Sequence, residues 1–165
     1  MFERYTEKAR RVIFFARYEA SQYGSPTIET EHILFGLLRE DKALIKRFLR
    51  SRASVKAVKW EVNEHIVIRK KIPTKVDLPL TNGAKRVLAY ACEEAQKLRH
   101  EHIGPEDLLL GLLREERSPA SRVLAGHGLM LKHVREELAR RPHRRELRPM
   151  LEKILGTVGL KLKRI

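Results

Sequence analysis

The chain has 165 residues, of which 42% are hydrophobic, and a formal net charge of +14. This length and composition suit a globular protein with one domain, or with two halves that pack closely around an apolar core. No apolar run approaches the roughly 18 residues that a membrane span needs, and Glu3 lies where a signal peptide would have a basic start, so we expect a cytoplasmic protein.

The first 40 residues predict two helices. Over residues 9–23 apolar side chains recur at intervals of three and four, which marks one buried helical stripe, and Thr6 precedes this stretch as a good helix cap. We expect Thr30 to cap a second helix, because leucine-rich helical spacing follows it. Glu31 then falls in the first turn, where the helix dipole favours an acid.

Two further helices and a linker complete the first half. The apolar spacing predicts a short helix over residues 44–49 and another that begins at a capping Ser54 and reaches Ile66. Residues 70–79 contain two prolines and are expected to form an extended linker. No segment shows a convincing strand pattern, although Val67-Ile68 alone fits either a helix or a strand.

The second half repeats the first at an offset of 75 residues. Between residues 5–40 and 80–115, 15 of 36 positions are identical, without a gap. Gly36 and Gly111 lie inside leucine-rich helices, where glycine costs about 1 kcal/mol relative to alanine, so we expect close helix approach at both. Matching helices are expected over residues 81–98, from Pro105 onward, over 120–125 and over 130–139.

These patterns predict an all-α fold class with two tandem four-helix repeats and a basic C-terminal helical extension. The first repeat covers residues 1–69, the linker covers 70–79 and the second repeat covers 80–140. The extension covers residues 141–165, and we expect the two repeats to pack as one domain.

Two segments resemble a known family. Residues 1–12, MFERYTEKARRV, resemble the start of ClpC-type AAA+ unfoldases, and residues 30–38, TEHILFGLL, resemble the signature of their amino-terminal (Clp-N) domain. The resemblance covers about residues 1–140 and implies a pseudo-twofold helical domain that receives substrates or adaptor proteins and hands them to an ATPase ring. The sequence has no phosphate-binding loop of an ATPase, and its arginine-rich end differs from the family's usual passage into that module, so we expect a free-standing homologue.

The resemblance also implies a ligand site. In ClpC-type relatives the paired repeats can bind phosphoarginine, a degradation mark, with a glutamate on the guanidinium and helix-start groups on the phosphate. The matching residues are Thr6, Arg10 and Glu31 in the first copy and Thr81, Lys85 and Glu106 in the second. These residue types are also ordinary helix caps and first-turn acids. The chain departs from the family signature at Glu29 and at Pro105-Glu106-Asp107, which adds negative charge near either site.

The remaining polar residues do not predict catalysis. His32 belongs to the family signature, and His100-Glu101-His102 lies in a loop without a second cluster of metal ligands. No Ser-His-Asp or Cys-His spacing argues for a nucleophile, and Cys92, the only cysteine, is expected to be a buried structural thiol. We expect no enzymatic activity, no metal and no cofactor.

The positive charge gathers in two segments. Residues 42–71 hold 10 basic and 2 acidic side chains, and residues 140–165 hold 9 and 2. Apolar residues interrupt both segments, which is typical of the solvated faces of amphipathic helices. If the two segments converge they would instead form a surface for a polyanion. The candidate residues for that surface are Arg47, Arg50, Lys56, Arg140, Arg141, Arg144 and Arg145.

Two functions therefore compete. The leading hypothesis is a non-enzymatic module of the Clp quality-control system, with no membrane role, that binds a substrate, an adaptor or an AAA+ ring. The alternative is a protein that binds nucleic acid or another polyanion on the same scaffold, because fold does not fix function. Salt separates them, since binding dominated by phosphate contacts weakens steeply as ionic strength rises.

Overall fold

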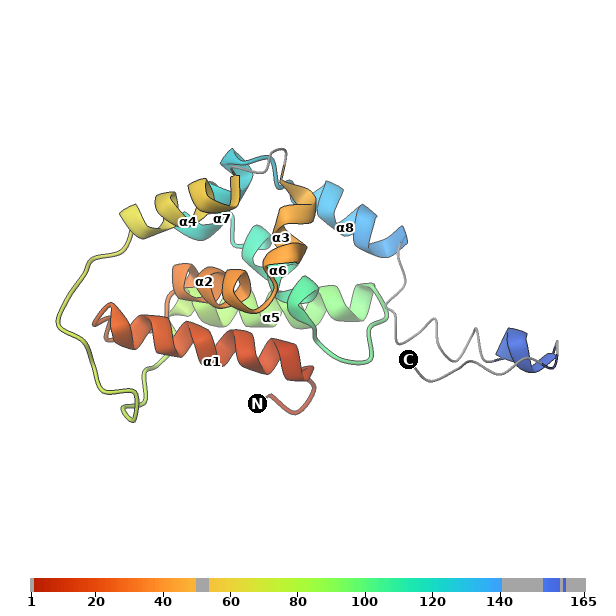
Figure 1. Cartoon of the computed structure of the whole chain (residues 1–165), viewed down its shortest axis with the longest axis horizontal. Coiled ribbons are helices and arrows are strands. Elements are labelled where there is room, and N and C mark those ends of the chain that lie inside the picture. Colours follow the sequence, from red (N-terminus) through yellow and green to blue (C-terminus); the bar gives the residue numbers. More distant parts are fainter. Residues whose placement is uncertain (1, 50–53, 141–152, 158, 160–165) are drawn as a thin grey trace.

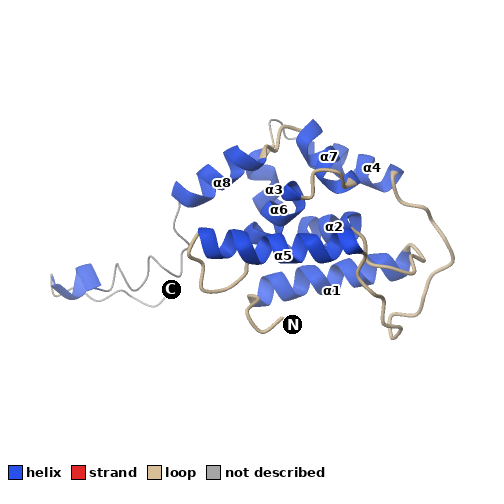
Figure 2. Cartoon of the chain, turned by 180° about the vertical axis from the view of Figure 1, so that it is seen from behind, coloured by secondary structure: helices blue, strands red, loops and turns tan. Residues whose placement is uncertain are grey.

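The computed structural model describes residues 2–49, 54–140, 153–157 and 159. Within them the chain is helical, and two isolated bridges are its only strand-like pairings, so the predicted all-α class is confirmed (Figures 1 and 2). A short helical stretch also covers residues 153–157. The main helices are α1 (Glu7–Gln22), α2 (Thr30–Glu40), α3 (Lys42–Phe48), α4 (Ser54–Glu64), α5 (Asn82–Lys97), α6 (Pro105–Arg114), α7 (Pro119–Gly126) and α8 (Leu131–Arg140).

The predicted caps of α1 and α5 are confirmed. The Thr6 hydroxyl accepts a hydrogen bond from the N–H of Ala9 at 3.1 Å, and the Thr81 hydroxyl accepts one from Ala84 at 3.2 Å. Each bond satisfies one of the free N–H groups at a helix start. The two helices therefore begin in the same way, 75 residues apart.

The predicted cap of α2 is wrong. Thr30 is the first helical residue, and Glu29 is the cap. The N–H of Glu29 donates to Nδ1 of His32 at 2.9 Å, while the buried Thr30 hydroxyl donates to the Glu31 carboxylate at 3.4 Å. The His32 side chain, three residues after the cap, thus accepts the backbone N–H of the cap residue, as in a capping box.

Both interior glycines allow close helix packing, as predicted. A Cβ on Gly36 would lie 2.3 Å from the carbonyl oxygen of Val12, and a Cβ on Gly111 would lie 2.4 Å from that of Val87. Side chains would force α1 away from α2 and α5 away from α6. The loss of helix propensity at glycine is therefore offset by backbone contact.

The two halves exchange equivalent main-chain bonds. The N–H of Thr6 donates to the carbonyl of Ile103 at 2.9 Å. The N–H of Thr81 donates to the carbonyl of Ile28 at 3.0 Å. The N–H groups of Ile103 and Ile28 return bonds of 2.9 and 2.8 Å to the residues that precede the opposite helix. Adding 75 to the residue numbers of the first copy gives the equivalent residues of the second, so each half makes to the other the bonds that it receives. This is the pattern of a twofold interface.

Helices α2 and α6 form the centre of the molecule. Every residue from Thr30 to Leu38 is buried, and so are Asp107 to Leu113 in α6. In Figures 1 and 2 they lie between α1 and α5 on one side and the arch of α4, α7 and α8 on the other. Their ends, rather than their sides, are what the centre of the fold can present to a partner.

The linker runs along the end of α1. The N–H of Arg69 donates to the carbonyl of Tyr23 at 2.8 Å, and a Cβ on Gly24, which has φ +70°, would lie 2.2 Å from the Lys70 oxygen. Residues 65–81 form no helix, with a turn at residues 74–76, and the close approach of Lys70 requires glycine at position 24. Helix α4 ends at Glu64, so the prediction that it reaches Ile66 is wrong. The β-branched run from Ile66 has low helix propensity.

No helix among the described residues combines the length and the apolar character that crossing a membrane requires.

Candidate functional site

The predicted site residues meet across the two copies. The bond from Thr6 to Ile103 places the start of α1, with Arg10, beside the start of α6, with Glu106. In the same way Thr81 places the start of α5 beside the start of α2, where a Cβ on Gly83 would lie 3.6 Å from the Thr30 side chain. Sequence order groups Thr6 and Arg10 with Glu31, and Thr81 and Lys85 with Glu106. The structure exchanges the two glutamates, so each pair of helix starts is composite.

Glu31 is a buried acid in the first turn of α2, with 5% of its surface exposed. Burial raises the pKa of its carboxyl, and the nearby charge of Glu29 raises it further. The Thr30 hydroxyl stabilises the ionised form only partly. A cationic ligand group would relieve this cost, because an opposite charge favours the carboxylate.

Glu106 occupies the equivalent position in α6 but lies differently. A Cβ on Gly104 would lie 2.6 Å from Oε1 of Glu106, so this carboxylate folds back over the helix start. In the first copy Glu29 stands at the position of Gly104, and its Cβ excludes the same arrangement. The two glutamates are thus equivalent in sequence and differ in environment.

The basic residues of the two helix starts also differ. Arg10 donates from Nε to the carbonyl of Phe2 at 3.2 Å and from Nη2 to that of Glu3 at 3.4 Å. Its guanidinium therefore holds the N-terminal segment against α1. Lys85, at the equivalent place on α5, is exposed. An anion at the α5 start would meet a more available cation than one at the α1 start.

His32, which sequence analysis assigned to no site, lies in the first turn of α2. Its side chain is fully buried, and burial lowers its pKa to about 4. Because Nδ1 accepts the Glu29 N–H, the neutral ring carries its proton on Nε2. No described residue accepts a hydrogen bond from Nε2.

The second copy has a histidine–aspartate contact at the same place. Asp107 stands at the position of His32 and accepts the N–H of Gly104 at 2.9 Å. Its carboxylate also contacts Nδ1 of His100, at the position of Ser25, at 2.9 Å. Sequence analysis considered His100 only together with His102 in the loop and did not connect it with Asp107. The alignment of the two copies contains the signal that was missed. Ser25 and His32 of the first copy are both replaced, by His100 and Asp107, in the second.

The same loop contains ligand atoms suited to a cation. His100, Glu106 and Asp107 offer nitrogen and oxygen atoms within 4.8 Å of one another. Burial raises the pKa of Asp107, and the His100 bond opposes that shift. Asp107 is already bonded to His100 and Gly104, so the cluster is explained by packing without an ion. The absence of a metal stays a prediction.

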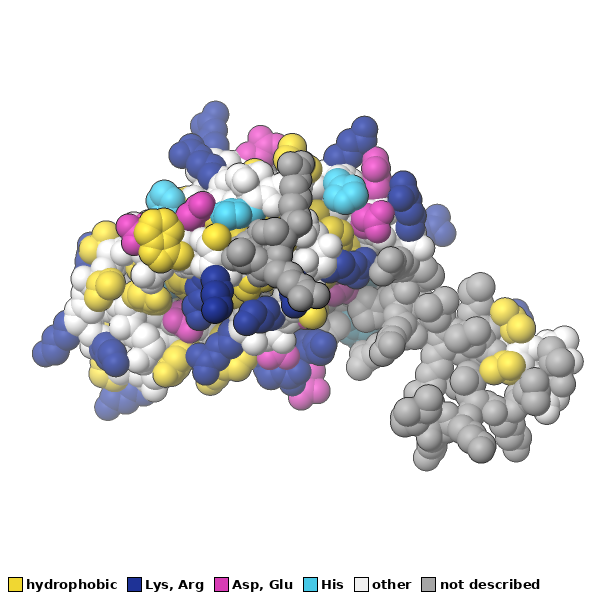
Figure 3. All heavy atoms as spheres, turned by 45° about the horizontal axis from the view of Figure 1, so that its top comes forward, with side chains coloured by type: hydrophobic (Ala, Val, Ile, Leu, Met, Phe, Trp, Pro, Cys, Tyr) yellow, Lys and Arg dark blue, Asp and Glu magenta, His cyan; other side chains and the backbone are white. Residues whose placement is uncertain are grey.

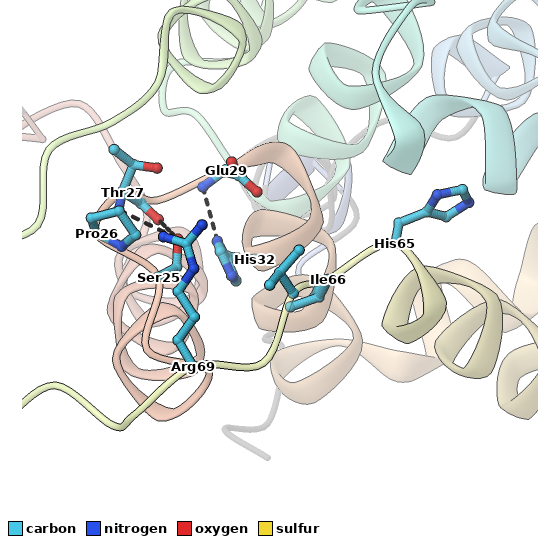
Figure 4. Close-up of a pocket in the computed structure, with 9 residues that line it drawn as sticks. Ser25, Pro26, Thr27, Glu29, His32, His65, Ile66 and Arg69 are labelled. Atoms are coloured by element: carbon cyan, nitrogen blue, oxygen red, sulfur yellow. Dashed lines mark hydrogen bonds between the residues drawn. The ribbon is translucent and has the colours of Figure 1, made fainter.

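A pocket lies beside His32 in the first copy. Its volume is about 270 Å³, and it opens between the α1–α2 loop, the start of α2 and the segment after α4 (Figure 4). The lining residues are Ser25, Pro26, Thr27, Glu29, His32, His65, Ile66, Val67 and Arg69. This pocket was not predicted from the sequence, because its walls come from segments 40 residues apart in the chain.

The predicted polyanion residues are only partly within the described chain. Arg47 on α3 and Lys56 on α4 are exposed, and Arg140 lies 3.2 Å from Glu137 at the end of α8. In Figure 3 the Lys and Arg side chains of this face are interleaved with acidic and hydrophobic ones. Arg50, Arg141, Arg144 and Arg145 lie outside the described residues, so the convergence of middle and tail stays a prediction.

Cys92 is not buried as expected. It is a free cysteine that is only partly buried against the core, and Arg4 donates to its sulfur at 3.8 Å. The helical spacing placed it on the apolar stripe of α5, but it lies at the margin of that stripe, where α5 meets the N-terminal segment.

Comparison with known sequences matches this arrangement to one domain family. The Clp repeat (R) N-terminal domain matches residues 4–127. The chloroplastic chaperone protein ClpC1 of Oryza sativa subsp. japonica is 43% identical over 141 residues, which is 85% of this chain and 15% of the relative. The ClpA homolog of Guillardia theta is also 43% identical over 141 residues, covering 85% of this chain and 17% of that protein. The chain thus spans about one sixth of the length of these curated relatives.

Solved structures show the same fold. The N-terminal domain of ClpD from Arabidopsis thaliana superimposes with a TM-score of 0.60 at 25% identity, over 82% of this chain and 92% of that one. The Hsp104 N-terminal domain from Candida albicans gives a TM-score of 0.65 at 21% identity, over 81% and 88%. The predicted Clp N-domain-like architecture is confirmed.

Proposed function

The chain belongs to the family of Clp repeat N-terminal domains, and from this premise we propose that it is a non-enzymatic module that binds substrates or adaptor proteins of a Clp chaperone system. The observation that carries the proposal is the reciprocal pairing of helix starts, which places an acid of one copy beside the free N–H groups of the other. Two such composite sites suit extended or modified protein segments better than a small cofactor. The repeats at residues 1–69 and 80–140 act as one domain in this proposal.

Phosphoarginine is the specific ligand that these composite sites support. The helix starts at Thr6 and Thr81 provide N–H groups and positive potential for a phosphate. Glu106 and Glu31 then provide carboxylates for the guanidinium. The raised pKa of Glu31 supports this assignment, because a buried acid gains most from a cationic partner. Lys85 favours the site that contains Glu31.

The competing function is binding of nucleic acid or another polyanion. The exposed Arg47 and Lys56 support it. Affinity capture from a native lysate at low and at physiological salt separates the two. The proposal expects unfoldase or protease subunits, or their adaptors, to be captured at both salt concentrations. Capture of nucleic acid alone, lost as salt rises, would favour the alternative. A cytoplasmic location stays a prediction.

A further inference from the structure

The pocket beside α2 contains a buried donor that needs an acceptor. His32 is 0% exposed, its ring is neutral, and its Nε2–H meets no acceptor among the described residues. A buried polar hydrogen without an acceptor destabilises the folded state. The ring forms part of the pocket wall, between Arg69 and Ile66 in Figure 4. Nε2 itself is covered, so a molecule in the pocket supplies the missing acceptor when the pocket wall moves enough to uncover this atom.

The second copy shows what fills this place when no ligand is needed. His100 extends from the position of Ser25 and bonds to Asp107. In the first copy the Ser25 hydroxyl is short and instead donates to the carbonyl of Thr27 at 2.6 Å. The space that an imidazole takes in one copy is thus open in the other. The side chains at the positions of Ser25 and His32 therefore differ between the two copies.

The rim of the pocket is basic. Arg69 lines it, is exposed, and forms no ion pair with another described residue. Lys70 and Lys71 follow it along the extended linker and are also exposed. Glu29 is the one acid that lines the pocket. A ligand with several separate negative charges fits this row, with one of them inside the pocket.

We propose that this pocket binds a carboxylate side chain from an acidic segment of a protein partner, with His32 Nε2–H and the Arg69 guanidinium as its donors. Lys70 and Lys71 contact further acids of the same segment. The inference rests on the proposed function, because it names the chemistry of one partner surface, and it adds a site separate from the composite helix starts. The volume of about 270 Å³ suits one side chain and is below that of an ordinary cofactor site.

The charges of the pocket favour a carboxylate over a phosphate. His32 is neutral and offers a single dipolar donor, and Arg69 is the only Lys or Arg among the residues that line the pocket. One guanidinium balances a carboxylate with one negative charge and forms a two-pronged bond with it. A phosphate carries up to about two charges and would face Glu29 with an uncompensated excess.

The test is the binding of a blocked, fluorescein-labelled peptide of alternating glutamate and glycine, measured by fluorescence anisotropy. Arg69→Gln is expected to weaken binding about tenfold, because it removes a charge-assisted pair. The matched control is Arg117→Gln, which removes an exposed arginine from the α6–α7 loop, outside the pocket, and should change little. The same peptide with glutamine should not bind. Equal binding by wild type and Arg69→Gln would overturn the proposal.

A transplant from the second copy tests the His32 contact without unbalancing the fold. The double variant Ser25→His/His32→Asp copies the His100–Asp107 pair and should fill the pocket. It is expected to unfold at a denaturant concentration near that of wild type and to lose binding about tenfold or more. Undiminished peptide binding by this folded variant would contradict the site.

Two further readouts assign the ligand and separate this site from the proposed function. The ¹⁵N and ¹H signals of His32 Nε2–H should shift when the glutamate peptide is added, and an unshifted signal would contradict the contact. A phosphoserine peptide that binds more tightly through Arg69 would overturn the choice of a carboxylate. If lysate capture finds no Clp partner while the glutamate peptide still binds through Arg69, the proposed function fails and the pocket stands.

Discussion

The two copies share a framework, meaning the contacts that hold their helices together, and differ at several other polar positions. Both have a threonine cap, a glycine at the helix crossing, and an arginine bound to the end of the next helix, as in Arg11–Glu40 and Arg86–Glu115 at 2.7 and 2.8 Å. These contacts involve the backbone or the ends of the central helices. Each contact is needed for the halves to pack, and so both copies retain it.

The acids inside the copies show the opposite behaviour. Glu94 in α5 is fully buried and accepts two bonds from Arg135, at 2.6 and 2.9 Å. The equivalent Glu19 is 23% exposed and lies 3.5 Å from Arg39. The counterpart of Arg135 is Trp60, which is 64% exposed on α4. The second copy therefore buries an ion-paired acid where the first copy has a partly exposed acid with a longer ion pair.

The largest predicted difference concerns this buried ion pair. Arg135→Ala should lower the free energy of unfolding by about 3 kcal/mol, because it leaves Glu94 buried without its main partner. Burial would raise the pKa of Glu94, and the bonds and charges of Arg135, with Lys97 and Arg114, outweigh it and lower that pKa. Arg39→Ala in the first copy should cost about 1 kcal/mol or less. Urea denaturation measures both, and equal losses would break the comparison.

The glycine crossings should respond alike. Gly36→Ala and Gly111→Ala each place a Cβ within 2.4 Å of a backbone oxygen, so the helices must separate. Overpacking of this kind costs about 2 kcal/mol, after a gain of about 1 kcal/mol in helix propensity. The same denaturation series should show two similar losses. A loss confined to one variant would show that the framework is not shared.

His32 should also give the first copy a pH dependence that the second copy lacks at this position. An unfolded histidine titrates near 6.5, whereas the folded pKa is about 4, so the unfolded state binds more protons between these values. The free energy of unfolding should therefore fall by about 2 kcal/mol as pH drops from about 7 to 5. Protonation of Glu31, whose pKa is raised, acts in the opposite direction.

The control for this pH effect is His32→Asn. Asparagine keeps an acceptor for the Glu29 N–H and does not titrate, so the slope that belongs to His32 should disappear while the contribution of Glu31 remains. An identical slope in both proteins would assign the pH dependence to other groups.

Local features of the fold followed from the sequence. The spacing of apolar residues located the helices, and the threonines at 6 and 81 were correctly assigned as caps, because these signals lie within one turn of the chain. The offset of 75 predicted the repetition and the role of Gly36. The assignment of Thr30 was wrong by one residue, because Glu29 is the cap and its N–H is bound by His32, three residues further on.

Features that depend on which segments meet in space did not follow. The exchange of Glu31 and Glu106 between helix starts requires the reciprocal bonds of Ile28 and Ile103, which no local pattern encodes. The burial of Glu94 depends on an arginine 41 residues away. The pocket at His32 also depends on the segment after α4, residues 65–69, which no local pattern places beside the start of α2.

Calorimetry with free phosphoarginine tests the central claim, that helix starts from opposite copies form two composite sites. The wild-type protein should bind two molecules, and Glu31→Ala or Glu106→Ala should each leave one site, with the α5 site lost in the first variant. The double variant should give no binding heat. No heat from the wild-type protein, or two sites retained in both single variants, would contradict the account.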